Sequence, residues 1–318
     1  LYNSFAAGCV SAMFLAAVPN FISMAHYIKS DIPMLFCALC FFYLCLISSE
    51  KKDIRICFLS GVFLGFAAAF KYNALLNYVV VPLSVLSAPS ENYRNRFNLG
   101  DMIRWNITAI AGALAGFTLT NPFWLLDYDT FIRHIKDLIS FTGGDTRYGQ
   151  SGGWRNYIYV ILDMGEKRVF LGLFFIVGII TSVFSDFKKN ILPLSLVLLT
   201  YIVCARQRIQ QWQYFLGAIP YMAVLSGYTA NVFALYIKNK AGAAGNRFFR
   251  ALVLLLIVDS IGVSIEYNYY RSRKDTRQMA MEWIGNNIPE GSRIFLDVNG
   301  PQLKQSREII RKQYEFAL

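Results

Sequence analysis

The sequence has little charge, and this shortage excludes a soluble globular protein. Asp, Glu, Lys and Arg make up 16% of the 318 residues, whereas a soluble chain carries roughly 25%. Hydrophobic residues make up 55%, the mean hydropathy is +0.39, and predominantly apolar runs such as Ala251–Val263 are too long for a soluble core. The composition therefore indicates a polytopic membrane protein and excludes disordered and fibrous classes.

Histidine is also scarce, and the one close cysteine pair, Cys37 and Cys40, lies in an apolar segment, which argues against a zinc site or a disulfide framework. The two histidines, His26 and His134, are too far apart in the sequence to form a metal-binding motif. The six cysteines lie in or beside apolar segments, where we interpret them as small buried hydrophobic residues. The spacing of a catalytic triad or a nucleotide-binding loop is missing as well. The chain starts with Leu and without a targeting signal, so we expect further residues before it.

Basic residues outnumber acidic ones, and the net charge is +11. The Lys and Arg residues occur in short clusters between apolar runs, which is typical of membrane-protein loops, so we predict no nucleic-acid partner. One set of loops (49–55, 89–105, 186–190 and 237–250) holds 12 basic residues in 43 positions, and the other set holds 10 in 69. The denser set is predicted to face the cytoplasm, at a plasma (inner) membrane.

Apolar stretches of about 20 residues predict an all-α polytopic fold with about nine transmembrane helices. The predicted spans are 5–19, 32–48, 55–70, 74–88, 106–122, 168–185, 191–205, 213–235 and 251–266. In this orientation residues 1–266 form a transmembrane domain with a long outer loop at 123–167. Residues 267–318 form a tail on the same outer side.

The outer loop is predicted to begin with a surface helix. Tyr128–Phe141 has an amphipathic pattern, and Asp127 or Asp129 can cap its start. We expect this helix to rest on the membrane surface.

A glycine-rich stretch, 143–153, follows this helix and holds five Gly in eleven residues. We interpret it either as a flexible connector or as a mobile lid over an active site. In the second case Asp145 and Arg147 are candidates for substrate contact.

The tail predicts the start of a small α/β domain outside the membrane. Asp275–Asn287 reads as a capped helix, Arg293–Val298 as a short strand, and Gln302–Tyr314 as a second helix. The tail is therefore a partial exoplasmic α/β domain in this interpretation.

One acidic and one basic side chain lie at the predicted hairpin of the second and third spans. Asp31 is 21 residues before, and Lys71 19 residues after, a tight turn centred near Lys52. At about 1.5 Å rise per residue, both side chains lie within roughly 3 Å of the same depth. They form either a structural ion pair or a functional pair, in which an acid stands beside a phosphate-binding cation.

Two arginines and a tryptophan are predicted to emerge at the same outer face. Arg206 and Arg208 follow the seventh span, and Trp212 opens the eighth. Arg suits bidentate phosphate binding, and Trp suits the membrane interface or stacking on a sugar. The alternative is that the arginines extend to lipid headgroups. Together with the acid–lysine pair, this set suits an anionic, membrane-anchored substrate better than an ion pathway.

Five sequence motifs, in order along the chain, resemble one known family. They are Tyr27–Pro33 (YIKSDIP), Gly61–Asn73 (GVFLGFAAAFKYN), Asn121–Phe131 (NPFWLLDYDTF), Gln213–Pro220 (QYFLGAIP) and Thr276–Asn299 (TRQMAMEWIGNNIPEGSRIFLDVN). The chain is similar to bacterial GT-C membrane glycosyltransferases, in the group of the dolichyl-phosphate-mannose-protein mannosyltransferases and the lipid A aminoarabinose transferases. Gln213 stands where this group usually has Arg.

The resemblance implies transfer of a sugar from a polyprenyl-phosphate donor to a glycan, lipid or protein acceptor at the outer face, with inversion. Asp31 corresponds to the second outer-face acid, Lys71 to the outer-face lysine, and Arg206 with Arg208 loosely to phosphate contacts. The family's principal base lies in an earlier outer loop, so we expect it in preceding spans. A divalent metal ion is one option at this site, and no other cofactor is predicted.

Two other classes of function remain open at this stage. A transporter or permease would fit a polytopic chain, but the spans show no inverted repeat and no pair of broken helices at mid-membrane. A non-catalytic membrane scaffold would fit if the preceding residues lacked an acidic loop.

Overall fold

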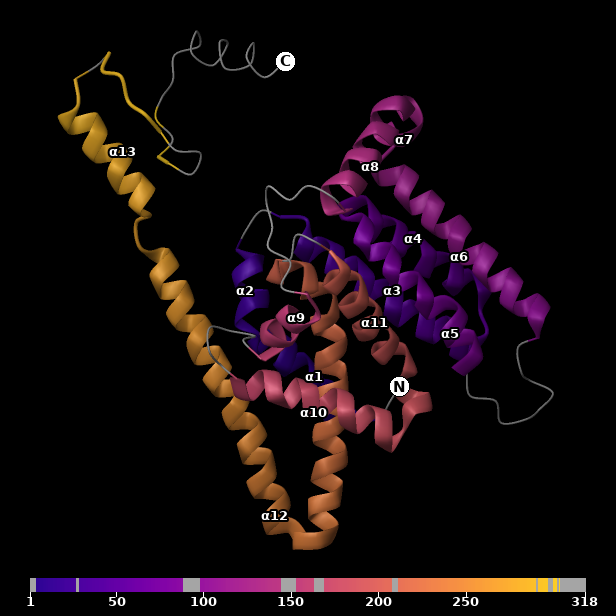
Figure 1. The fold of residues 1–318 in the computed structure, drawn as a ribbon. Coiled ribbons are helices and arrows are strands. Elements are labelled where there is room, and N and C mark those ends of the chain that lie inside the picture. Colours follow the sequence, from indigo (N-terminus) through magenta and orange to yellow (C-terminus); the bar gives the residue numbers. More distant parts are fainter. Residues whose placement is uncertain are drawn as a thin grey trace. The chain divides into compact units, whose positions relative to one another are not determined.

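The computed structural model describes residues 4–26, 29–87, 98–143, 153–162, 169–207, 211–289, 291–296, 300–301 and 303. The regular elements in these ranges are all helices (Figure 1), which confirms the predicted all-α class for this part of the chain. The chain divides into two compact units, Leu1–Ser264 and Ile265–Leu318. The candidate site belongs to the first unit.

The chain is a multi-pass membrane protein, but the described residues do not show all nine predicted spans. Four helical runs are long and apolar enough to cross a membrane, and a fifth is the bent pair α1 and α2, with 63° between its halves. These runs are α3 (Asp31–Lys51), α6 (Leu99–Thr120), α11 (Phe187–Arg206) and Trp212–Asn287, with α1 at Phe5–Ala17 and α2 at Pro19–Ala25.

Helix length explains most of this difference. The other apolar helices are α4 (Ile54–Phe70), α10 (Val169–Ser185) and the run formed by η1 (Tyr72–Val79) and α5 (Val80–Ser87). None exceeds 17 residues, so each rises by at most about 26 Å, which is less than the roughly 30 Å of a hydrocarbon core. The last two predicted spans both lie within the single run that starts at Trp212.

Helices α3 and α4 form a hairpin with a two-residue turn, Lys52 and Asp53, close to where the sequence predicts it. Lys52 adopts the left-handed conformation, with φ of 52°, and ends α3. The side chain of Asp53 then accepts a hydrogen bond of 2.8 Å from the Arg55 N–H and caps α4. Because the turn is this short, the first residue of α3 and the residue after α4 lie at the same end of the hairpin.

Helices α4 and α6 approach each other until their backbones touch. Gly61 and Gly65 of α4 face Gly112 and Gly116 of α6, so each helix contributes a Gly-x-x-x-Gly pair. A Cβ placed on any of the four would lie 2.2 Å from a backbone carbonyl oxygen of the other helix. Small residues permit this close approach in membrane helices. The contact fixes the position of α4, at whose end Lys71 is located.

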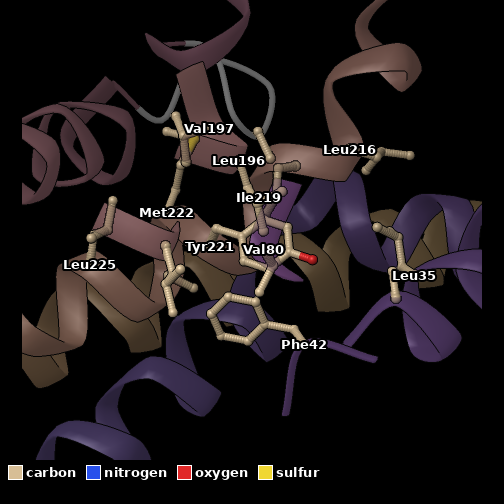
Figure 2. Packing of buried hydrophobic residues seen from close by; sticks show 14 of the residues in the cluster. Leu35, Phe42, Val80, Leu196, Val197, Leu216, Ile219, Tyr221, Met222 and Leu225 are labelled. Carbon is tan, nitrogen blue, oxygen red and sulfur yellow. The ribbon is translucent and has the colours of Figure 1, made fainter. Parts of the chain in front are cut away.

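The core joins α3, α5, α11 and α12 (Ile219–Ser272). Figure 2 shows Tyr221 of α12 above Phe42 of α3, and their ring centroids are 5.2 Å apart. The Tyr221 hydroxyl is buried and donates a hydrogen bond of 2.6 Å to the Asn77 side chain, so its polar atom is satisfied. The first part of α12 is thereby attached to the segment that follows Lys71.

Helix α12 consists of two arms rather than one straight helix. Gly242 has a positive φ of 68°, and the chain reverses there, as Figure 1 shows at the label of α12. The rings of Phe233 and Phe249 pack across the reversal, 6.2 Å apart. The basic loop predicted at 237–250 is therefore a helical hairpin.

The predicted outer loop contains three helices. After α7 (Phe123–Leu126), the expected surface helix is present as α8 (Tyr128–Gly143), and Asp127 caps it by accepting a hydrogen bond of 3.3 Å from the Thr130 N–H. The sequence analysis missed α9 (Gly153–Leu162). Its Tyr157 is fully buried and stacks near Phe215.

The prediction of an α/β tail is wrong for the described residues. The expected helix is present as α13 (Thr276–Asn287), capped by Asp275. Arg293–Leu296, the described part of the expected strand, is not a strand. A strand needs a neighbour for its backbone hydrogen bonds, and the described chain offers none here. Apart from Leu303, the expected helix at Gln302–Tyr314 lies outside the described residues.

Candidate functional site

Asp31 and Lys71 form an ion pair at the mouth of the α3–α4 hairpin. The Lys71 ammonium donates to Oδ1 of Asp31 over 2.6 Å. The Asp31 side chain is 5% exposed and that of Lys71 is 27% exposed. A buried carboxylate needs a partner, and the half-exposed lysine supplies it. The predicted juxtaposition of these two residues is therefore correct, while their roles stay predictions.

Local sequence explains why both charges lie at helix ends. Asp31 is the first residue of α3, where the helix dipole favours a carboxylate. Lys71 ends α4 with an extended backbone, and its N–H still donates to the Ala67 carbonyl over 3.0 Å. The lysine side chain thus leaves the helix axis toward the end of α3.

Lys71 lines a cavity of about 590 Å³ between the hairpin, η1 and α11. The walls are mostly apolar, with side-chain amides from Asn73, Asn77 and Gln207. Asp31 is not among the residues that line this cavity. Of the two members of the ion pair, Lys71 therefore lines the cavity and Asp31 does not.

The sequence analysis missed Tyr214, which contacts the lysine from a distant part of the chain. Its ring centroid is 5.4 Å from the Lys71 ammonium, a cation–π distance, and it also lines the cavity. Tyr214 belongs to η4 (Trp212–Ala218). Its neighbour Gln213 accepts a hydrogen bond of 3.2 Å from Lys29. The motifs around Gln213 and Lys29 were visible in the sequence, but their contact was not.

The other predicted site residues are placed as follows. Arg206 is exposed in the last turn of α11, and the next residue, Gln207, lines the cavity. Trp212 opens η4 and is 36% exposed. Arg208, Asp145 and Arg147 lie outside the described residues. The described cavity thus includes Lys71, and Arg206 is not among its lining residues.

Helix α8 covers one side of the cavity. Its Leu138 and Ile139 are lining residues. Near its start, Phe131 packs in an aromatic cluster with Tyr72, Phe117 and Trp124, whose ring centroids lie 6.3–6.5 Å from that of Phe131. The cluster attaches α8 to the residue that directly follows Lys71.

A divalent metal ion does not fit the described residues. Among them, no three His, Cys, Asp or Glu side chains gather as ligands. Asp31 is a single carboxylate and its charge is already balanced by Lys71, whereas Mg²⁺ and Ca²⁺ require several oxygen ligands. We therefore assign no step to a metal.

Comparison with known proteins agrees with the resemblance seen in the sequence. Residues 1–120 match the model of the family described as dolichyl-phosphate-mannose-protein mannosyltransferase. No curated protein and no solved structure matches the chain. The matched part contains both Asp31 and Lys71, whereas Arg206 and Tyr214 lie beyond it. Over residues 1–120 the chain is therefore similar to the dolichyl-phosphate-mannose-protein mannosyltransferase family, a family of GT-C membrane glycosyltransferases.

Proposed function

We propose that this chain transfers a sugar from a polyprenyl-phosphate donor to an acceptor at the outer face of the membrane, with inversion at the anomeric carbon. One observation carries the proposal above all others. A lysine ammonium, held by a buried carboxylate at 2.6 Å, faces a cavity with apolar walls and a few amide groups. Such a cavity suits a ligand that joins a phosphate and a sugar to a long apolar chain.

The donor phosphate is the leaving group in this reaction. An oxygen of the acceptor forms a bond to the anomeric carbon while the bond between that carbon and the phosphate oxygen breaks. The electron pair of the broken bond stays on the phosphate, and the acceptor hydroxyl loses its proton to a carboxylate base. Lys71 stabilises the negative charge that develops on the phosphate.

Asp31 acts through Lys71 in this proposal. Its carboxylate fixes the ammonium in place, so that no reorientation is needed when charge develops on the donor. Tyr214 adds a second fixed contact through its ring. The resemblance assigns the proton-accepting base to an acid in another outer loop, and Asp31 is a positioning residue here.

Binding of a polyprenyl phosphate to the full-length protein in detergent tests the phosphate contact. Lys71→Gln should weaken binding by roughly tenfold to a hundredfold, because a charge-assisted hydrogen bond contributes about 1.5–3 kcal/mol. Lys51→Gln, at the other end of α3 and exposed, is the matched control and should bind like the wild type. Equal binding by wild type and Lys71→Gln would place the phosphate elsewhere.

The same polyprenyl-phosphate titration tests the contribution of the two arginines to donor binding separately from that of Lys71. If Arg206 and Arg208 contact the donor phosphate, each Arg→Gln change should weaken donor binding. Arg→Lys should then recover only part of the lost affinity, since an ammonium cannot bind bidentately. Unchanged binding in the double Arg→Gln variant would leave them as anchors to lipid headgroups.

Cysteine labelling from outside the cell tests the proposed orientation. In a cysteine-free background, single cysteines at Gln150 and Ser292 should react with an impermeant maleimide, while one at Asn239 in the α12 hairpin stays protected. The reason is the higher density of Lys and Arg in the loop set that includes 237–250, which retains these loops in the cytoplasm. Labelling at Asn239 with protection at Gln150 would reverse the orientation and contradict transfer at the outer face.

A further inference from the structure

A second cavity, of about 350 Å³, lies between α1 and the two arms of α12. The first arm contributes small residues to its wall, Gly227, Ala230 and Ala234. A Cβ on Gly227 would lie 2.5 Å from the Ala7 carbonyl oxygen of α1, so the backbones of α1 and α12 are in close contact there. The small side chains thus leave an apolar hollow between three helices.

This cavity is separate from the Lys71 site. Gly217 lines the first cavity and Ala234 the second, and both belong to one helical run. Seventeen residues separate them, which corresponds to about 25 Å along a helix. The second cavity therefore lies close to the α12 hairpin and far from the proposed chemistry.

One cationic side chain, Arg250, lines the second cavity. The packing of Phe233 against Phe249 places Arg250 level with the hairpin end of the cavity, while Gly227 and Leu254 line its deeper part. The cavity is therefore cationic at one end and apolar along its length.

The surrounding charge is of one sign. The α12 hairpin also carries Lys238, Lys240 and Arg247, and the sequence contains no Asp or Glu between Asp186 and Asp259. None of the ion pairs between described residues includes Arg250. The hairpin therefore carries four positive charges, of which Arg250 lines the cavity, and no carboxylate from the same segment competes with them.

We propose that this cavity binds one anionic glycerophospholipid, with the phosphate at Arg250 and one acyl chain between α1 and the arms of α12. Basic pockets between membrane helices bind anionic lipid headgroups, and an arginine binds a phosphate bidentately. The donor lipid is a poorer occupant, because its phosphate would then lie at the second cavity, about 25 Å along the helical run from the first cavity that Lys71 lines.

Native mass spectrometry of the full-length protein in a neutral detergent tests this proposal, with palmitoyl-oleoyl phosphatidylglycerol and the matching phosphatidylcholine as probes. The wild type should retain one phosphatidylglycerol and bind it at least about tenfold more tightly than phosphatidylcholine. Arg250→Gln should remove this preference. Arg104→Gln, an exposed cation of α6 outside the cavity, should leave it unchanged.

Ala234→Phe fills the cavity and leaves all charges in place, so it should also reduce phosphatidylglycerol binding. If this variant does not fold, the comparison of Arg250→Gln with Arg104→Gln still decides the question. Equal losses in those two variants, or equal binding of both lipids by the wild type, would overturn the proposal. Displacement of phosphatidylglycerol by an equal concentration of polyprenyl phosphate would overturn it as well, in favour of a donor subsite.

Discussion

Asp31→Asn should reduce sugar transfer by about a hundredfold or more while most of the protein still folds. The amide keeps the shape of the carboxylate but cannot balance the Lys71 charge across 2.6 Å. The ammonium is 27% exposed and can turn toward water in the cavity. A displacement of about 1 Å in a positioning group costs roughly a hundredfold in rate. The measurement is transfer of a radiolabelled sugar from a polyprenyl-phosphate donor in membranes that contain the full-length protein.

Stability is expected to change less than rate in this variant. Loss of one partner from a fully buried ion pair costs about 3–5 kcal/mol, but here the remaining lysine reaches the cavity mouth, so the cost should be smaller. Thermal unfolding in detergent measures this part of the effect.

The double variant Asp31→Asn with Lys71→Gln distinguishes a catalytic pair from a structural one. It removes both charges and leaves two amides that can bond to each other, so folding stability should return toward the wild-type value. Transfer should stay low, because the cation at the donor phosphate is gone. Transfer at the wild-type rate in this neutral pair would show that Asp31 and Lys71 only stabilise the hairpin. The coupling between the two sites follows from the full double-mutant cycle.

Gly65→Ala should destabilise the protein by roughly 1–3 kcal/mol, the usual range for an overpacked interior. The added methyl would lie 2.2 Å from the Ala113 carbonyl oxygen and 2.6 Å from the Phe117 nitrogen. Both are backbone atoms of α6, so the two helices must separate. Because α4 ends shortly before Lys71, the separation should also slow transfer. The transition temperature of the purified protein measures the first effect.

The same substitution at Gly262 is the matched control. Gly262 lies in the second arm of α12, and a Cβ there has no atom within 4 Å. Ala is a better helix former than Gly by roughly 0.8–1 kcal/mol, so Gly262→Ala should be neutral or stabilising. If both variants shift the transition temperature in the same direction and by the same amount, the close contact of α4 with α6 does not limit stability.

Part of the site could be predicted from sequence because it depends on local geometry. Asp31 and Lys71 are joined by two helices and a two-residue turn, so counting residues from Lys52 is enough to place both at one level. Tyr214 could not be placed in this way. Tyr214 contacts the lysine from η4, so its position depends on how α11 and α12 pack against the α3–α4 hairpin. Counting residues along the chain does not predict that packing.

The sequence by itself determined the membrane class, the helical fold and the acid–lysine pair, because hydrophobicity, helical rise per residue and tight turns are local properties. Tertiary structure alone decided which apolar helices are long enough to span, that Tyr157 of α9 is buried within a segment expected to be a loop, and that Arg250 borders a cavity. These features depend on contacts between residues far apart in the chain. Apolar composition marks a segment as buried in lipid or protein, and only packing against specific neighbours selects between the two.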